Sequence, residues 1–531
     1  MITLLHHLVH HNPSCRGDDE AIRFRDRALT YRQLADETRR FGAGLLEAGL
    51  EKQERVAIYL PKRLETVVAF FGTSWAGGVF VPVNPLLKPE QVAHVLRDCN
   101  ARFLVTSGDR LAQLEPALEH CHDLHTVVLT DSGDGDETDL PRRRVEWDAF
   151  LAGGAEETPP PLIDGDMAAI LYTSGSTGRP KGVVLSHRNM VAGAQSVAQY
   201  LENRREDRLL AVLPFSFDYG FSQLTTAFTV GASVVLMDYL LPRDVIRAVE
   251  RHQITGLAAV PPLWVQLARL PWPEGAVTSL RYITNSGGAM PGEVLKALRQ
   301  ALPSTRVYLM YGLTEAFRST YLPPEELDRR PDSMGRAIPN AEIMVVREDG
   351  SPCAPGEPGE LVHRGALVAL GYWNDPERTR ERFRPAPGRP GGIPLQETAV
   401  WSGDTVRMDE EGFLYFIGRK DDMIKTSGYR VSPTEVEEVC YASGLVGEAA
   451  AIGLPHSQLG QAIVVVATPA EGAERVDEEA LQNHCRERLP AFMVPLRVIT
   501  EPTLPRNPNG KIDRKQLALR YQDLFSEESS P

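Results

Sequence analysis

Short apolar runs alternate with amphipathic stretches along the first half of the chain. Thr30 and Gln33 form the pattern of a helix N-cap, and the apolar side chains that follow recur at helical spacing up to Gly49. The apolar run at 56–60 then predicts a buried strand. Strand, helix and strand in repetition favour a largely parallel sheet with helices on both faces.

The same alternation continues downstream. It predicts a helix from about Pro89 to Cys99, strands that begin near Phe103 and Thr126, and further strands and helices as far as the strand at Ser233. An acidic stretch and a run of prolines interrupt this rhythm and predict exposed loops. The first half of the chain is therefore expected to be an α/β domain.

Two changes of pattern divide the rest of the chain. From Ala341 to Val368 the apolar runs are short and separated by Gly and Pro, as in a small antiparallel sheet or barrel. Beyond that, charged helical stretches flank one long apolar run, which predicts a separate α+β domain of about a hundred residues. We expect a large domain at 1–418, with a barrel-like part at about 340–418, and a small domain at 419–531.

The composition is that of a globular protein, with 42% hydrophobic and 24% charged residues in 531. The chain carries 57 basic and 71 acidic side chains, a formal charge of −14. This excess of acid argues against a nucleic-acid partner that binds a broad face. An anionic ligand must therefore be held by local groups.

Six cysteines lie far apart, without a CxxC pair or a metal-binding spacing, which predicts free thiols in a reducing cytoplasm. The first residues lack a secretory pattern. The apolar stretch from Val67 to Val83 is interrupted by Gly77 and Pro82, and is expected to be a buried helix that leads into a buried strand. We therefore expect a cytoplasmic protein with no integral membrane segment.

The segment TSGSTGRPK follows an apolar run and combines hydroxyls, glycines and a lysine. Glycines let the backbone aim several N–H groups at one anion, hydroxyls add donors, and lysine adds charge. The pattern predicts a phosphate-binding loop, although flexible surface loops share its composition. Its residues are Thr173, Ser174, Gly175, Ser176, Thr177, Gly178 and Lys181. No Ser or Thr follows the lysine, so this is not the loop of the P-loop nucleotidases.

With its flanks, LYTSGSTGRPKGVVLSH at 171–187 resembles the signature of the adenylate-forming enzymes: acyl- and aryl-CoA synthetases, amino-acid-activating domains and luciferases. Matching segments in the family order follow at 286–289 (SGGA), 311–315 (YGLTE), 401–438 and 504–517. The resemblance covers the chain from about Ala21 to Gln516. It implies two mainly parallel sheets, a small β-barrel subdomain and a mobile C-terminal domain.

The resemblance also implies roles for single residues in binding ATP and Mg²⁺. Tyr311 would lie against adenine, Thr314 would contact the α-phosphate, and Glu315 would help to hold the metal. Taken alone, such a tyrosine is more often a core aromatic and such a glutamate a solvated carboxylate. The strip beside adenine and the glycine of the second motif would be Gly287, Gly288, Ala289 and Gly312.

The segment from Trp401 to Glu438 would complete the nucleotide site. Asp404 would bind the ribose hydroxyls and Arg419 the ribose or phosphate, although the same two residues would also suit a surface ion pair. By the same resemblance, Asp421 is the hinge between the domains. Gly428 and Arg430 belong to the CoA side, where a glycine lets the pantetheine thiol pass.

Lys511 follows a Pro-Asn-Gly turn near the end of the chain. A lysine on a tight turn can reach into a cleft as a mobile point charge, and in the family this residue contacts the substrate carboxylate and the α-phosphate. The implied reaction has two steps. A carboxylate attacks the α-phosphate of ATP to give an acyl-adenylate and pyrophosphate, and a thiol then displaces AMP.

The acceptor and the acid are less closely defined. Leu313 and the SGYRV run resemble free-standing CoA ligases, which favours CoA. Phe217 and Asp218 resemble the pair with which amino-acid-activating domains bind an α-ammonium, so a polar acid, or a carrier protein as acceptor, stays open. Asp218 would also suit a helix cap. The small carboxylic acid is expected to contact Phe217, Asp218, Trp264 and Gly288.

A third class, a non-catalytic relative that only binds nucleotide, would lack one of the charged groups of the site. All of them are present, at Lys181, Glu315, Asp404, Arg419 and Lys511. The sequence therefore favours an AMP-forming carboxylic acid–CoA ligase that uses ATP, Mg²⁺ and CoA.

Overall fold

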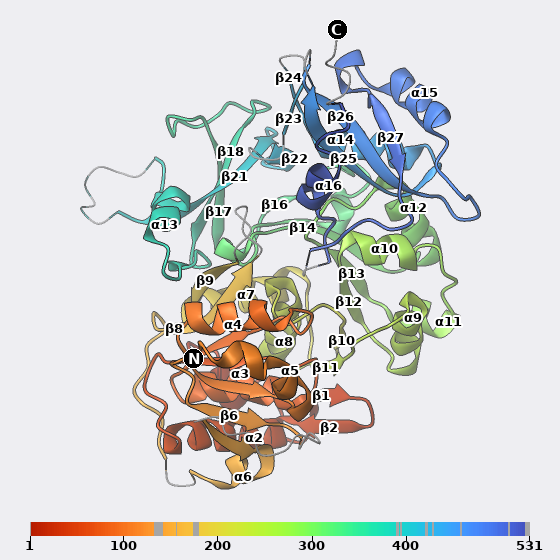
Figure 1. Cartoon of the computed structure of the whole chain (residues 1–531). Coiled ribbons are helices and arrows are strands. Elements are labelled where there is room, and N and C mark those ends of the chain that lie inside the picture. Colours follow the sequence, from red (N-terminus) through yellow and green to blue (C-terminus); the bar gives the residue numbers. More distant parts are fainter. Residues whose placement is uncertain are drawn as a thin grey trace.

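The computed structural model describes residues 2–131, 142–154, 157–173, 180–388, 392, 394, 396–419, 423–426, 429–456, 459–507 and 510–525, with the backbone alone for 425, 429 and 430. Figure 1 shows the N-terminal half at one end of the molecule and the C-terminal strands and helices, in blue, at the other. A small sheet, in teal, lies to the side between them.

One sheet of nine strands follows the order β16-β15-β14-β13-β12-β10-β11-β1-β2. The six strands from β14 to β1 in that order are parallel to one another, and the strands beyond them at both edges are antiparallel. The strands are β1 (Glu20–Phe24), β2 (Arg27–Thr30), β10 (Arg208–Ala211), β11 (Ser233–Leu236), β12 (Gly256–Ala259), β13 (Tyr282–Asn285), β14 (Arg306–Tyr311), β15 (Thr320–Leu322) and β16 (Arg336–Ala337).

A second sheet of eight strands follows the order β19-β9-β8-β4-β3-β5-β6-β7. It is parallel except that β8 and β9 form an antiparallel pair and β19, from far along the chain, adds antiparallel to β9. The strands are β3 (Arg55–Ile58), β4 (Val79–Pro82), β5 (Ala101–Thr106), β6 (Thr126–Leu129), β7 (Arg143–Glu146), β8 (Met167–Thr173), β9 (Lys181–Ser186) and β19 (Gly371–Tyr372).

The helices that cover these sheets include the predicted one after Thr30, whose hydroxyl accepts from the Gln33 N–H at 3.3 Å while the Thr30 N–H donates to the Gln33 side chain. They are α1 (His7–His10), α2 (Tyr31–Glu47), α3 (Leu64–Trp75), α4 (Pro89–Asp98), α5 (Gly108–Leu118), α6 (Trp147–Ala152), α7 (His187–Tyr200), α8 (Asp218–Val230), α9 (Pro242–Arg251), α10 (Pro261–Leu267), α11 (Glu274–Ser279) and α12 (Gly292–Ala301), with short 3₁₀ turns η1 (Thr314–Ala316) and η2 (Pro324–Glu326).

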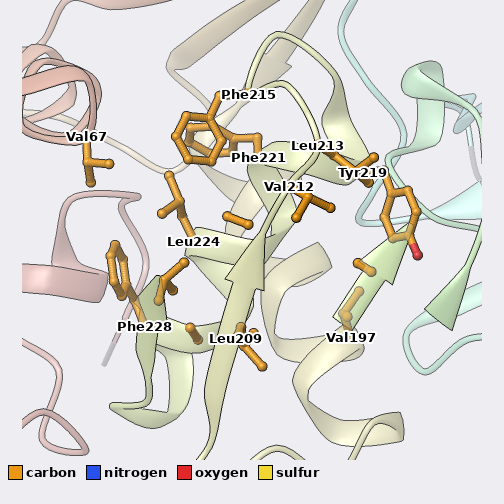
Figure 2. Close-up of a cluster of buried hydrophobic side chains, with 14 of the residues drawn as sticks. Val67, Val197, Leu209, Val212, Leu213, Phe215, Tyr219, Phe221, Leu224 and Phe228 are labelled. Atoms are coloured by element: carbon orange, nitrogen blue, oxygen red, sulfur yellow. The ribbon is translucent and has the colours of Figure 1, made fainter. Parts of the chain in front are cut away.

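The core of the large domain is aromatic where α3 and α8 meet the strands. The ring of Phe221 stacks on Phe80 at 5.2 Å and contacts Phe70 edge-on at 5.4 Å. Figure 2 shows Phe221 beside Phe215 and, further along the same helix, Leu224 and Phe228. Such rings bury a large apolar area each, so this cluster holds α8 firmly between the sheets.

The third sheet is antiparallel throughout, with the order β17-β18-β21-β20 and β22 paired to β21. Short strands separated by Gly and Pro were expected in this region. Its elements are β17 (Ala341–Val346), β18 (Gly359–Gly365), α13 (Pro376–Arg382), β20 (Phe383–Pro385), β21 (Thr398–Met408) and β22 (Leu414–Arg419).

The last sheet has the order β24-β23-β26-β25, with β27 parallel to β26, and has core clusters of its own. Its elements are β23 (Ile424–Thr426), β24 (Tyr429–Val431), α14 (Pro433–Ala442), β25 (Val446–His456), β26 (Gly460–Pro469), α15 (Glu478–Arg488), η3 (Ala491–Met493), β27 (Arg497–Thr500) and α16 (Arg514–Arg520). The predicted fold class, an α/β domain with a barrel-like sheet and an α+β C-terminal domain, is confirmed. The antiparallel edge strands make both large sheets mixed.

The apolar stretch from Val67 to Val83 folds as predicted, because it forms most of α3 and all of β4, both buried. In the part of the chain that the structure describes, none of the helices has the length and apolar character needed to cross a membrane.

Candidate active site

A cavity of about 2330 Å³ lies between the large domain and the C-terminal sheet. Its walls come from the ends of β8, β13 and β14, from β21 and β22, and from α14 and α16. Ten of the residues predicted from sequence line it: Thr173, Lys181, Gly287, Gly288, Ala289, Tyr311, Gly312, Asp404, Arg419 and Lys511.

The sheet explains why segments far apart in sequence meet here. β13 ends at Asn285 and β14 at Tyr311, and the two strands are parallel neighbours. The residues that follow them therefore emerge at the same edge, where open α/β sheets bind their ligands. Gly287 has a φ of +83°, a conformation that side chains rarely adopt, so glycine suits this close turn.

Lys181 and Glu315 form an ion pair of 2.9 Å beside the cavity. The hydroxyl of Tyr372 joins them, since it lies 2.8 Å from the lysine Nζ and donates to the same carboxylate oxygen at 2.5 Å. Burial would raise the pKa of Glu315, but the charge of Lys181 and these hydrogen bonds hold that pKa below its usual value. Glu315 is therefore an anion ready to bind a cation.

Asp404 lies on β21 opposite Arg419 on β22, and only 2% of its surface is exposed. One carboxylate oxygen accepts from the Arg419 Nε at 3.0 Å and the other from the Tyr311 hydroxyl. Burial and the neighbouring Asp404 raise the pKa of Tyr311, which keeps the phenol protonated as a donor. The three predicted nucleotide residues thus form one hydrogen-bonded group on the cavity wall.

Lys511 comes from the C-terminal domain but reaches the large domain. Its N–H donates to the Asn507 side chain at 3.0 Å, in a turn completed by Gly510 at φ +80°. Its Nζ lies 5.9 Å from the centre of the Phe217 ring, and a methyl group at Gly287 would stand 3.3 Å from its Cε. Burial and the charge of Arg419 lower the pKa of Lys511, while Asp218 and Asp404 oppose that change.

Asp218 is the first residue of α8 and is 4% exposed. The helix N-cap is Phe217, and the Asp218 carboxylate instead accepts from the Thr314 hydroxyl at 3.1 Å. The helix-capping alternative is therefore wrong for Asp218. Burial raises the pKa of Asp218, against the opposing effects of Arg318, Thr314 and Lys511.

Like Asp218, the predicted substrate residues Trp264 and Phe217 are not among the residues that line the cavity, although Phe217 lies close to Gly287 on its wall. Trp264 is fully buried, and its indole N–H donates to the Ala259 and Thr284 carbonyls at 3.0 and 3.2 Å. Phe217 is partly buried and packs edge-on against Tyr219 at 6.1 Å. Their position in the resemblance had placed both residues in the substrate pocket, but the main chain already satisfies the Trp264 indole and the Phe217 ring packs against the core.

Some predictions fall outside the described residues. These are Ser174, Gly175, Ser176, Thr177 and Gly178 of the predicted phosphate loop, and Asp421 and Gly428 of the hinge and CoA side. Arg430 lies in β24, where its backbone pairs with Lys425.

The site also contains residues that sequence reasoning missed. Tyr372 reaches Lys181 only because β19 pairs with β9, and no local motif marks it. Ser216 and Asn285 line the cavity, and each has a buried side-chain oxygen without a hydrogen-bond partner in the described part of the chain, as does Thr173. Unpaired polar atoms of this kind need a polar ligand or water. The Thr173 and Ser216 hydroxyls can donate to phosphate oxygens, whereas Asn285 Oδ1 can only accept, as from a ligand hydroxyl or amino group. The single carboxylate of Glu315 fits Mg²⁺ that is bound mainly through phosphate oxygens.

Comparison with known sequences decides the family. The profile of the AMP-binding enzymes matches residues 9–373, and that of the AMP-binding enzyme C-terminal domain matches residues 435–511. The chain belongs to the AMP-binding enzyme family. This confirms the resemblance to the adenylate-forming enzymes that was drawn from the motifs.

Individual relatives of the AMP-binding family match over nearly their whole length. The long-chain-fatty-acid–CoA ligase of Salmonella typhimurium is 30% identical, with 96% of this chain and 93% of the relative covered. The sulfoacetate–CoA ligase of Cupriavidus necator is 32% identical, with 92% of each covered. The ATP-bound crystal structure of MatB from Rhodopseudomonas palustris superimposes with a TM-score of 0.86 at 26% identity, over 99% of this chain and all of that one.

Proposed function

We propose that this protein is an AMP-forming carboxylic acid–CoA ligase. It activates a carboxylate with ATP to an acyl-adenylate, releases pyrophosphate, and transfers the acyl group to the thiol of CoA. The observation that carries the proposal is the position of Lys511. It reaches from the C-terminal domain to Gly287, on the wall of a cavity that Asp404 and Lys181 also line, and to the Phe217 ring close to that wall.

The first half-reaction collects negative charge at the α-phosphate. The carboxylate oxygen forms the new bond to phosphorus, and pyrophosphate leaves with the electron pair of the bond that breaks. Such a step needs cations and donors aimed at the phosphate rather than a general base. Lys511 and Lys181 supply charge, and Thr173 supplies a hydroxyl whose oxygen has no other partner among the described residues.

ATP would lie along the residues that line the cavity. Adenine would contact Tyr311 and the Gly287, Gly288 and Ala289 strip, and the ribose hydroxyls would bind Asp404 and Arg419. Mg²⁺, when bound beside Glu315, would neutralise phosphate charge. Glu315 would then exchange its Lys181 contact for the ion, which leaves Lys181 free to move toward phosphate oxygens. Thr314 would contact the α-phosphate only after its hydroxyl leaves Asp218.

In the second half-reaction the thiol attacks the acyl carbonyl and AMP leaves. We assign residues 1–418 and 419–531 to two units that reorient about Asp421, so that Gly428 and Arg430 face the CoA thiol while Lys511 withdraws. This reorientation would let one cavity serve two chemical steps that need different side chains. We further propose a cytoplasmic location, because the six cysteines are free thiols, which a reducing compartment preserves.

The test is acid-dependent ATP–pyrophosphate exchange over a panel of fatty, aryl, hydroxy, dicarboxylic and amino acids. Exchange driven by one class establishes adenylation, and the same acid is then offered with CoA or with a phosphopantetheinylated carrier protein. Thioester formed on CoA supports the proposal. If the acyl group is transferred only to the carrier protein, the acceptor is that protein and not CoA. If the protein binds ATP but no acid drives exchange, the ligase function is refuted.

A further inference from the structure

A buried arginine lies beside the candidate acid site and has no role in the reaction described above. Arg318 is 1% exposed and is one of the largest fully buried side chains. Its Nη1 donates to the Ser286 hydroxyl at 3.2 Å and its Nη2 lies 3.5 Å from the Ser222 hydroxyl. Its Nε has no hydrogen-bond partner within the described ranges.

This guanidinium is a charge without a close counter-ion. Arginine stays protonated in proteins, and burying such a charge is costly unless an anion compensates it. Within the part of the chain that the structure describes, no carboxylate oxygen forms an ion pair with Arg318. The charge of Arg318 acts on Asp218 and lowers its pKa, but burial raises that pKa by more. The raised pKa disfavours the ionised carboxylate, so Asp218 is a weak counter-ion for Arg318.

Arg318 does not itself line the cavity, but the backbone places it directly behind a residue that does. Phe317, just before it, has a φ of +56°, an outlier for a bulky residue. Gly312 lines the cavity, and a methyl group there would stand 3.1 Å from the Cα of Arg318 and 3.5 Å from its Cδ. Strain that persists in such a place is typical of functional sites.

The surroundings of the arginine connect it with the cavity. Its partner Ser286 lies between Asn285 and Gly287, which both line the cavity. Ser216, on the same wall, has an unpaired buried hydroxyl that can donate to an anion as well. Beneath the guanidinium, the Tyr219 ring lies 4.7 Å away and holds the side chain in place.

We propose that Arg318 is a specificity-determining residue that binds a second anionic group on the acid, so that the substrate is a short dicarboxylic acid. One carboxylate meets Lys511 and the α-phosphate, and the other meets the Nε edge of Arg318. This inference rests on the proposed ligase function and names the substrate class of that same site.

The charge of Arg318 also decides against the alternative that Asp218 suggested. An α-ammonium group beside Asp218 would lie in the field of two further cations, Arg318 and Lys511, which both act on Asp218. Like charges in a buried site repel strongly. Arg318 also packs against Gly312 and bonds Ser286, next to the residues of the adenine strip, which leaves little length between the two anionic groups of the acid. The acid is therefore expected to be short and dianionic.

The test compares acids that differ only at the distal end, with ATP–pyrophosphate exchange as the readout. Malonate, succinate and glutarate are measured against their monomethyl esters and against β-alanine and γ-aminobutyrate. Wild type is expected to prefer one diacid over its ester by at least about 100-fold in kcat/KM, because a site built for a polar group rejects an analogue without it. The Arg318→Met variant is expected to lose about 100-fold with the diacid and little with the ester.

Protein stability separates this role from a structural one. Because Arg318 forms no ion pair with any residue that the structure describes, R318M is expected to melt at the wild-type temperature or above it. Arg330→Met is the matched control, since Arg330 is also buried, at 8% exposure, but pairs with Glu326, Asp409 and Glu411. R330M should melt lower while the preference for the diacid stays. Arg318→Lys keeps the positive charge but loses the paired N–H donors of the guanidinium. Its preference for the diacid over the ester should therefore lie between those of wild type and R318M.

Three results would overturn the inference. If an ester or amino acid drives exchange as well as the diacid, the substrate needs no second anionic group, and the ligase function still stands. An R318M variant that melts lower and loses all acids equally would make the arginine structural. Exchange with no acid at all, although ATP binds, would refute the ligase function itself and the inference with it.

Discussion

Glu438 is expected to make domain closure depend on pH. It lies on α14, lines the cavity, and faces Asp332 of the large domain. Burial, then Asp332, then the neighbouring Glu437 raise its pKa from 4.5 to about 7, against a hydrogen bond from the Gly292 backbone. In the open arrangement this carboxyl would titrate near its ordinary value.

The sign follows from the raised pKa. Closure is easiest when Glu438 is protonated, and it loses stability as pH rises from 4.5 to about 7, with no further loss above. The difference between the Glu438 pKa values of the closed and open arrangements corresponds to at most ~3 kcal/mol in the free energy of closure. Because the side chain keeps some contact with water, we expect the pH-dependent part to be ~1–2 kcal/mol. That is about 5- to 30-fold in the population of the closed form.

The perturbation is Glu438→Gln, which removes the charge and keeps the shape. The assay is the ratio of the pyrophosphate-exchange rates of variant and wild type between pH 5 and 8.5, in which ionisations common to both proteins cancel. The ratio should rise from near unity to about 5–30. Glu479→Gln, at an exposed position on α15, is the control and should give a flat ratio. A flat or falling ratio for E438Q would refute the reasoning.

Further variants test single groups of the site. Lys511→Ala should slow pyrophosphate exchange by about 10²–10³-fold and largely spare thioester formation from a supplied acyl-adenylate; equal loss in both assays would contradict its role. Glu315→Gln should weaken the Mg²⁺ dependence of exchange by about 10-fold or more, seen in a metal titration, and an unchanged titration would exclude a metal contact. Gly220→Ala should lower the melting temperature, because its methyl group would stand 2.0 Å from the Pro214 carbonyl oxygen; unchanged melting would show that α8 can shift.

The sequence predicted those features that depend on contiguous residues. The helix after Thr30, the buried α3 and β4, and the motif segments that end β13 and β14 were all visible in local patterns. Each of them is set by a short-range rule, such as a cap, a hydrophobic period or a signature.

Features that depend on pairing between distant segments were missed. Tyr372 completes the Lys181–Glu315 group across 191 residues, through a two-residue strand that has no sequence signal. Arg318 is ordinary in sequence and unusual only in its burial. Trp264 was placed in the substrate pocket by its position in the resemblance, but the tertiary structure uses its indole N–H to bind two carbonyls.

The late addition of β19 (Gly371–Tyr372) to the edge of the second sheet has a consequence for the order of synthesis. β9 (Lys181–Ser186) is made early, and among the strands that the structure describes its outer edge pairs with β19 alone. Until the ribosome has released residue 372, this edge presents unpaired backbone groups next to an apolar run, the kind of surface on which nascent chains associate wrongly.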